Sequence, residues 1–197
     1  MGERSRSRTT RRWECLRPRY RARSHGPDYD LDGDLDLYAA MVNEPNRLMR
    51  NDGGGVFTLA TPPELALTGY FQTAEWCDVD DDGAPDLFVT YCFISPSDKL
   101  FLNDGDGTFT DVTAGPMANP GYAYRAAFSD YDNDGRMDLY VTNEPQRNYL
   151  YRNLGGGLFA DSTDAAEGLQ TSSTGVTWGD FNNDGWSDLY PTFRTPA

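Results

Sequence analysis

The chain has 197 residues, a formal net charge of −14, a hydrophobic content of 38% and an aromatic content of 13%. A domain of this size can bury a substantial core, while 20 Gly and 12 Pro residues argue against a helical protein and favour an all-β one. The acidic balance leads us to expect no nucleic-acid partner, and no membrane span is expected either.

The first 27 residues differ from the rest, because they hold nine Arg against Glu3 and Glu14 while the remainder is strongly acidic. They show no periodic apolar pattern and no apolar run long enough for a secretory signal peptide. Arg-rich runs can bind nucleic acid or act as transit peptides, and Arg11-Arg12 faintly resembles a twin-arginine signal, but no apolar region follows. We interpret residues 1–27 as a disordered Arg-rich leader or a misplaced gene start, without an assigned function.

Four acidic segments follow, with Asp or Asn at positions one, three and five, Gly at six and Asp at nine. They are Asp28, Asp30, Asp32, Gly33 and Asp36; Asp78, Asp80, Asp82, Gly83 and Asp86; Asp130, Asp132, Asp134, Gly135 and Asp138; and Asp180, Asn182, Asp184, Gly185 and Asp188. Oxygen ligands on a short flexible loop suit Ca2+ better than Zn2+ or Mg2+. The segments therefore predict up to four Ca2+ sites, each completed by the backbone carbonyl of the seventh residue: Asp34, Ala84, Arg136 or Trp186.

An EF-hand is the competing interpretation, because its loop also begins D-x-D-x-D-G. An EF-hand needs a bidentate Glu at position twelve, and that position holds Ala39, Val89, Val141 and Pro191. The segments that follow, such as Asp138-Leu-Tyr-Val141, are aromatic and β-branched, which is typical of strands. We expect the Asp at position nine to bind the ion directly and to close the site.

The acidic segments recur at spacings of 50, 52 and 50 residues, which indicates a repeat architecture. Each of the first three is followed by an apolar run, a Gly-rich turn and an aromatic residue, as in Leu150-Tyr-Arg-Asn-Leu-Gly-Gly-Gly-Leu-Phe159. Small and aromatic residues precede the later segments and predict an inner strand. Each unit therefore reads as four antiparallel strands, the blade of a β-propeller.

The expected organisation is a partial β-propeller of three blades and an incomplete fourth: 28–70, 71–122, 123–172 and 173–197. The inner strand expected before Asp28 is missing, and Pro191 interrupts the last strand unless that strand lies at an edge. Such a piece cannot close a ring of about four to eight blades. Either the chain is a fragment, or several copies assemble and self-associate through open blade faces.

The D-x-D-x-D-G-x-x-D-L loop, its strand and the N-x-G-x-G-x-F hairpin resemble the FG-GAP/VCBS repeat of integrin α-like propellers. The third unit, with Asp161-Ser-Thr163 and Gly168-Leu169, is most similar to repeats of cartilage acidic protein relatives. The resemblance covers residues 28 to about 190. It implies Ca2+ in the first hairpin loop of each blade, partner binding elsewhere on the disc, an adhesion role, and a secreted or periplasmic location.

Catalysis has little support in the sequence. The single His is His25, in the leader, and no nucleophile stands beside a recognisable base. Arg125, Arg147 and Arg152 keep open the alternative of a fragment of a Ca2+-dependent polysaccharide-degrading enzyme, or of a glycan-binding propeller. An enzyme would gather Arg or Lys, Tyr and a carboxylate outside the acidic loops in one cleft.

Two similar segments lie between the second and third strands of blades one and three, at the face opposite the acidic loops. A protein or glycan ligand is expected there, through Asn43, Glu44, Arg47, Asn143, Glu144 and Arg147. The alternative is that Asn-Glu-Pro is only a turn.

Cys77 and Cys92 flank the second acidic segment, but strand geometry places them too far apart for a disulfide. We expect both to be small buried hydrophobes, and Trp76, Phe128 and Trp178 to pack between blades rather than bind sugar.

Overall fold

The computed structural model describes residues 26–93, 97–118, 121–163 and 173–193. These residues form fourteen strands and two short 3-10 helices, η1 (Pro63–Leu65) and η2 (Gly115–Ala118), so the predicted all-β class is confirmed. None of these described helices is long or apolar enough to cross a bilayer. His25, Cys15 and residues 1–25 of the predicted leader lie outside the described residues.

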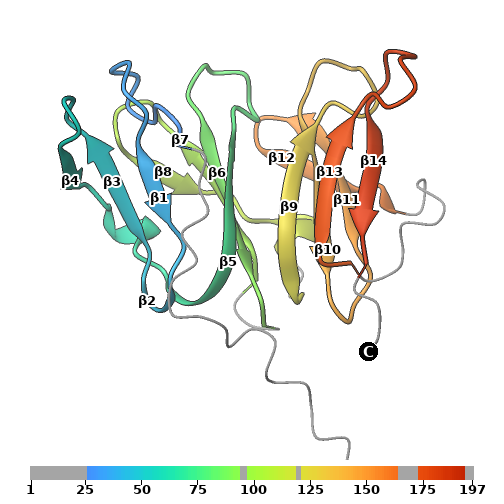
Figure 1. Cartoon of the computed structure of the whole chain (residues 1–197), viewed down its shortest axis with the longest axis horizontal. Helices are drawn as coiled ribbons and strands as arrows, with labels where there is room; N and C mark the ends of the chain where they lie inside the picture. The colour runs from blue at the N-terminus through green and yellow to red at the C-terminus, as the bar shows by residue number, and fades with distance from the viewer. Residues whose placement is uncertain (1–25, 94–96, 119–120, 164–172, 194–197) are drawn as a thin grey trace, which may run out of the picture.

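The strands form four antiparallel sheets that stand side by side (Figure 1). The first has the order β1-β3-β4, with β1 (Leu37–Ala39), β3 (Arg47–Asn51) and β4 (Phe57–Leu59). The second has the order β2-β5-β6-β7-β8, with β2 (Val42–Pro45), β5 (Thr68–Cys77), β6 (Asp86–Tyr91), β7 (Lys99–Asn103) and β8 (Phe109–Asp111). The third has the order β12-β11-β10-β9, with β9 (Ala123–Ser129), β10 (Asp138–Asn143), β11 (Tyr149–Gly155) and β12 (Leu158–Asp161). The fourth pairs β13 (Gly175–Gly179) with β14 (Asp188–Thr192).

β6 and β10 are the most buried strands, since every residue of each is buried. Alternation along β6 sends Leu87 and Val89 into the core shared with the first sheet, and Phe88 into the core shared with the third. A strand that feeds two cores must be apolar on both faces. This explains the near-continuous apolar runs after each acidic loop.

Aromatic side chains connect neighbouring sheets. Tyr38 meets Trp76 of the next sheet edge-on, with ring centroids 6.1 Å apart, and Tyr140 meets Trp178 in the same way at 6.3 Å. Phe128 packs against the core between the second and third sheets. The prediction that these aromatic residues serve packing between blades is confirmed.

The strand that contains Pro191 lies at a sheet edge, as the sequence required. Pro191 of β14 pairs with Val176 of β13, and among the described strands β14 is bonded only to β13. β2 was not predicted: Val42 and Pro45 leave the first sheet and pair with Tyr70 and Thr68 of β5. This strand pairing joins the first blade to the second.

The acidic segments lie together at one edge of the molecule, at the top of Figure 1. The last three join β5 to β6, β9 to β10 and β13 to β14, and the first precedes β1. The Gly-rich hairpins end at the same edge: Asn51 Nδ2 donates to Leu35 O, and Arg136 Nε donates to Asn153 O, both at 3.1 Å.

Candidate metal sites

Each acidic loop is folded by its own carboxylates. The first Asp accepts the backbone N–H groups of the fifth and sixth residues, as when Asp130 Oδ1 accepts from Asp134 at 3.0 Å and Oδ2 accepts from Gly135 at 2.9 Å. The fifth residue then accepts the N–H of the seventh. Both patterns recur in all four loops, at Asp28 and Asp32, Asp78 and Asp82, Asp130 and Asp134, and Asp180 and Asp184.

Two left-handed residues make the turn tight enough for these bonds. One is the Gly at position six, since Gly33, Gly83, Gly135 and Gly185 have φ between 87° and 97°, a range that Gly adopts without strain. Position four is also left-handed, and it holds Leu31, Asp81, Asn133 and Asn183. Asn and Asp tolerate this conformation well, so their presence at three of the four positions was a signal in the sequence.

The Asp at position nine connects its loop to the third strand of the same blade. Asp86 accepts the N–H of Val79 at 2.7 Å through Oδ2 and the N–H of Asn103 at 2.9 Å through Oδ1. Asp36 and Asp138 make the same two bonds. Burial raises the pKa of Asp86 to about 7, although the two N–H donors oppose the shift. This residue therefore has a structural role beyond the predicted one of ion ligand.

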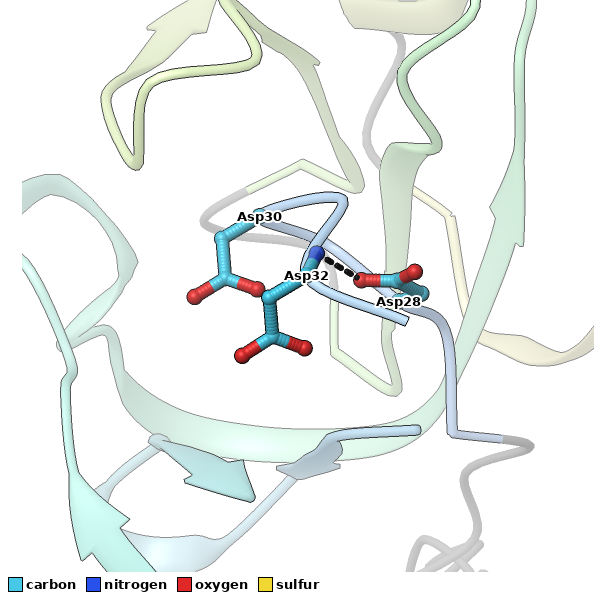
Figure 2. Close-up of side chains that lie close together, drawn as sticks. All are labelled: Asp28, Asp30 and Asp32. Atoms are coloured by element: carbon cyan, nitrogen blue, oxygen red, sulfur yellow. Dashed lines mark hydrogen bonds between the residues drawn. The ribbon is translucent and has the colours of Figure 1, made fainter. Parts of the chain in front are cut away.

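Three loops bring carboxylate oxygens close enough to share one ion. The groups are Asp28, Asp30 and Asp32; Asp78, Asp80 and Asp86; and Asp130, Asp132 and Asp138, each with its oxygens within 4.8 Å of one another. Figure 2 shows the first group on its loop. The Asp at position nine joins the group in loops two and three, whereas in loop one the Asp at position five does so.

The Asp at position three carries the strongest indication of a cation site. Oδ1 of Asp30, Asp80 and Asp132 is buried and accepts no hydrogen bond from any residue that the structure describes. Burying an unpaired charged oxygen is unfavourable, and native structures rarely leave one without a partner. The same orphan atom at the same position of three loops fits a hard cation held by oxygen ligands.

The fourth loop keeps the fold of the other three but not their cluster of carboxylates. Asn182 replaces the Asp at position three, and its Oδ1 accepts the N–H of Asp184 at 2.8 Å. Asp180 and Asp184 are exposed. Among the described residues no group of three carboxylates forms here, and the prediction that Asp180, Asn182, Asp184, Trp186 and Asp188 bind an ion stays a prediction.

The third loop is distinguished by two arginines. Arg152 Nε lies 2.6 Å from Asp132 Oδ2, an ion pair without hydrogen-bond alignment, and its Nη2 donates to Asp134 Oδ2 at 2.9 Å. Arg136 also pairs with Asp134. Partial desolvation raises the pKa of Asp134, but the N–H of Arg136 and the guanidinium groups outweigh it and hold the pKa below its ordinary value.

Adjacent loops are linked by an Asn at the end of the third strand. Asn103 Nδ2 donates to Tyr29 O of the first loop at 2.7 Å, and Asn153 Nδ2 donates to Val79 O of the second loop at 2.8 Å. Both Asn side chains are fully buried, and the backbone N–H of each residue also donates to the carboxylate at position nine of its own blade. The loops of blades one to three thus form one hydrogen-bonded row.

At the opposite edge, the two Asn-Glu-Pro segments adopt different structures. Arg47 pairs with Glu44 at 3.6 Å, both side chains being about half exposed. Arg147 instead donates to Asp161 at 3.1 Å and lies over the ring of Tyr149. That these segments bind a partner stays a prediction.

The cysteines follow the expectation only in part. Cys77 is free, so no bond joins it to Cys92, as predicted. Cys92 is fully buried, as expected, but it is disulfide-bonded, so the expectation that it is merely a small buried hydrophobe was wrong. Nothing near Cys92 in the sequence indicated this bond.

Comparison with known proteins identifies the repeat. A model of the FG-GAP-like repeat matches residues 28–89, 78–141 and 130–190, each match beginning at the first Asp of an acidic loop. A search of curated proteins finds no significant match. Among solved structures, an Agrocybe aegerita lectin, described for its specific recognition of non-reducing terminal N-acetylglucosamine, has a TM-score of 0.52 at 20% identity. The likeness covers 84% of this chain and 45% of the lectin chain, so this chain spans less than half the lectin's length, and the likeness shows the fold alone.

Proposed function

The chain belongs to the FG-GAP-like repeat family, and on that premise we propose that it is a calcium-binding interaction module of a β-propeller protein. The observation that carries the proposal is the buried, unpaired Oδ1 at position three of three loops. A bound Ca2+ would give each of these oxygens a partner. The proposed ligands are the carboxylates at positions one, three, five and nine, with the carbonyl at position seven.

Calcium fits these loops better than other common ions. The ligands are oxygen atoms on a turn with two left-handed residues, and Ca2+ accepts irregular coordination by six to eight oxygens. Mg2+ requires a near-ideal octahedron, and Zn2+ prefers His and Cys, which the loops lack. The ion would neutralise a row of loops that Asn103 and Asn153 already connect, so it would stiffen one edge of the molecule.

The rigid scaffold would present a ligand-binding surface at the opposite edge. We propose a protein or glycan ligand there, contacted through Asn43, Glu44, Arg47, Asn143, Glu144 and Arg147. The fold shared with a lectin supports a glycan as one class of ligand. A secreted or periplasmic location agrees with the disulfide at Cys92, since disulfides persist in oxidising compartments.

A non-catalytic role is part of the proposal. Arg152 is engaged by Asp132 and Asp134 of the third loop. Arg147, Tyr149 and Asp161 do come together, as an enzyme would require of such residues, but the guanidinium group already pairs with the carboxylate. Such a pair stabilises the charged forms of both groups and does not favour proton transfer.

Isothermal titration with Ca2+ tests the proposal. We expect at least three calcium ions per chain, and one fewer after Asp80→Asn. Asp81→Asn is the matched control, because Asp81 lies in the same loop at the left-handed fourth position and belongs to no carboxylate group. Absence of calcium binding, or equal effects of the two substitutions, would contradict the proposed site.

The ligand surface needs a separate experiment. A glycan microarray that includes N-acetylglucosamine-terminated glycans, probed with calcium-loaded protein, should give a signal that the Arg47→Ala/Arg147→Ala variant loses while its calcium binding stays unchanged. A signal that persists in this variant would assign both segments to structure alone.

A further inference from the structure

The third acidic loop has the same frame as the first two but a different charge balance. Loops one and two each contain five aspartates, and none of these pairs with an Arg or Lys among the described residues. The third loop contains four aspartates, and two guanidinium groups touch it. Its formal charge is therefore much closer to zero before any ion binds.

Of the first three loops, the third has its negative charge offset by an Arg on the third strand of its blade, and the position of Arg152 explains this. Arg152 directly precedes Asn153, and Leu102 and Arg50 occupy the equivalent positions before Asn103 and Asn51. Leu102 is apolar and packs against the core between the second and third sheets. Arg50 pairs with Asp52, outside the acidic loop, at 2.8 Å. Thus, of the three side chains at this strand position, that of blade three pairs with the loop beside it, that of blade one pairs with an Asp outside the loop, and that of blade two is uncharged.

The carboxylates that Arg152 holds belong to the proposed site itself. Asp132 pairs with Arg152 through Oδ2, while its Oδ1 is the buried orphan oxygen. Asp134, at position five, is shared between Arg152 and Arg136. An ion in this loop would therefore have positive charge directly behind two of its ligands.

We propose that Arg152 is a built-in counter-ion of the third loop, which keeps this loop folded without calcium and makes its calcium site weaker than those of loops one and two. The inference rests on the proposed calcium sites, and it predicts that the sites fill in order, with the third filling after the first two. Even at the dielectric constant of water, a unit charge about 6 Å from a divalent ion changes its affinity about tenfold.

Calcium titration of the intact chain by calorimetry tests the proposal. Asp130→Asn identifies the third-site event as the one that it removes, and that event should be the weaker one in the wild-type chain. Arg152→Leu, which installs the residue found in blade two, should strengthen this event about tenfold. Arg50→Leu is the matched control and should change the first site less than Arg152→Leu changes the third, because the ion-pair partner of Arg50 is Asp52, which lies outside the loop.

A second measurement covers the metal-free state. With excess chelator, Arg152→Leu should lower the melting temperature, and calcium should restore it to the wild-type value. Arg152→Lys keeps the charge and should resemble the wild-type chain in both measurements, which separates loss of charge from a general folding defect.

The outcomes distinguish this inference from the proposed function. If the wild-type chain binds no calcium, the proposed function fails, and the chelator experiment still tests Arg152 as a counter-ion. If calcium binds but Arg152→Leu leaves the third-site affinity unchanged or weakens it, the inference is overturned while the calcium sites stand.

Discussion

Asp98 allows the packing account to be tested apart from calcium, because it is a buried carboxylate that lies outside the acidic loops, directly before β7. It is only 6% exposed and accepts the N–H of Tyr91 at 2.7 Å. Blades one and three place Asn46 and Asn148 at the equivalent positions, where each accepts the corresponding N–H. We predict that Asp98→Asn changes the pH dependence of stability.

Burial raises the pKa of Asp98 from its ordinary 3.8 to about 7, although the Tyr91 N–H opposes the shift. A carboxyl with a raised pKa in the folded state contributes stability that is fully present below about pH 4 and is lost as the pH rises through about 7. Between pH 5 and pH 8, the wild-type chain should lose about 3 kcal/mol from this group alone, as an order of magnitude. An Asn at this position has no such loss.

Urea unfolding at pH 5 and pH 8, in saturating calcium, measures the effect. The free energy of unfolding of Asp98→Asn, relative to the wild-type chain, should improve by about 3 kcal/mol between the two pH values. The variant will gain less than this in absolute free energy of unfolding at pH 8, because the new amide N–H needs a hydrogen-bond acceptor. In blade one the Tyr38 hydroxyl accepts from Asn46 Nδ2 at 3.0 Å, whereas blade two has Phe88 at the position of Tyr38.

The double variant Phe88→Tyr/Asp98→Asn rebuilds the Tyr–Asn pair of the other blades and should be more stable than Asp98→Asn alone. Asn148→Asp is the converse control and should introduce a loss of stability at pH 8. An identical difference between Asp98→Asn and the wild-type chain at both pH values would refute the reasoning.

Further predictions concern the connections between blades. Asn153→Ala should lower the free energy of unfolding by about 1–3 kcal/mol, because it leaves buried polar groups of two loops unpaired. Asn51→Ala loses only bonds within its own blade and should cost less than half as much in the same urea experiment. Phe181 and Tyr190 are each 61% exposed at the last described sheet. We expect the chain to self-associate through this sheet at high concentration, and Phe181→Ser/Tyr190→Ser to reduce the association seen by light scattering; a monomeric wild-type chain would contradict this.

The sequence predicted those features that repeat in register. The acidic frame, its 50-residue period and the strands after each loop led directly to side-by-side antiparallel sheets, because short-range pattern and turn chemistry determine them. Gly at position six, and Asn or Asp at position four of three loops, are residues that tolerate the left-handed backbone found at both positions.

Other features depend on contacts across large sequence separations. The Asn of the hairpin repeats visibly at 51, 103 and 153, yet its bond to a loop 74 residues away appears only once neighbouring blades are placed. The pairing of β2 with the next sheet and the reach of Arg152 into the third loop likewise depend on strand register. A local pattern does not determine these contacts.

The central claim is that the acidic loops hold calcium, and anomalous diffraction from crystals grown with calcium would test it most directly. The account predicts peaks in the first three loops, each about 2.3–2.6 Å from the Oδ1 atom of Asp30, Asp80 or Asp132. The third peak should be the first to disappear as calcium is lowered. Empty loops at saturating calcium, with these oxygens still buried and unpaired, would contradict the account.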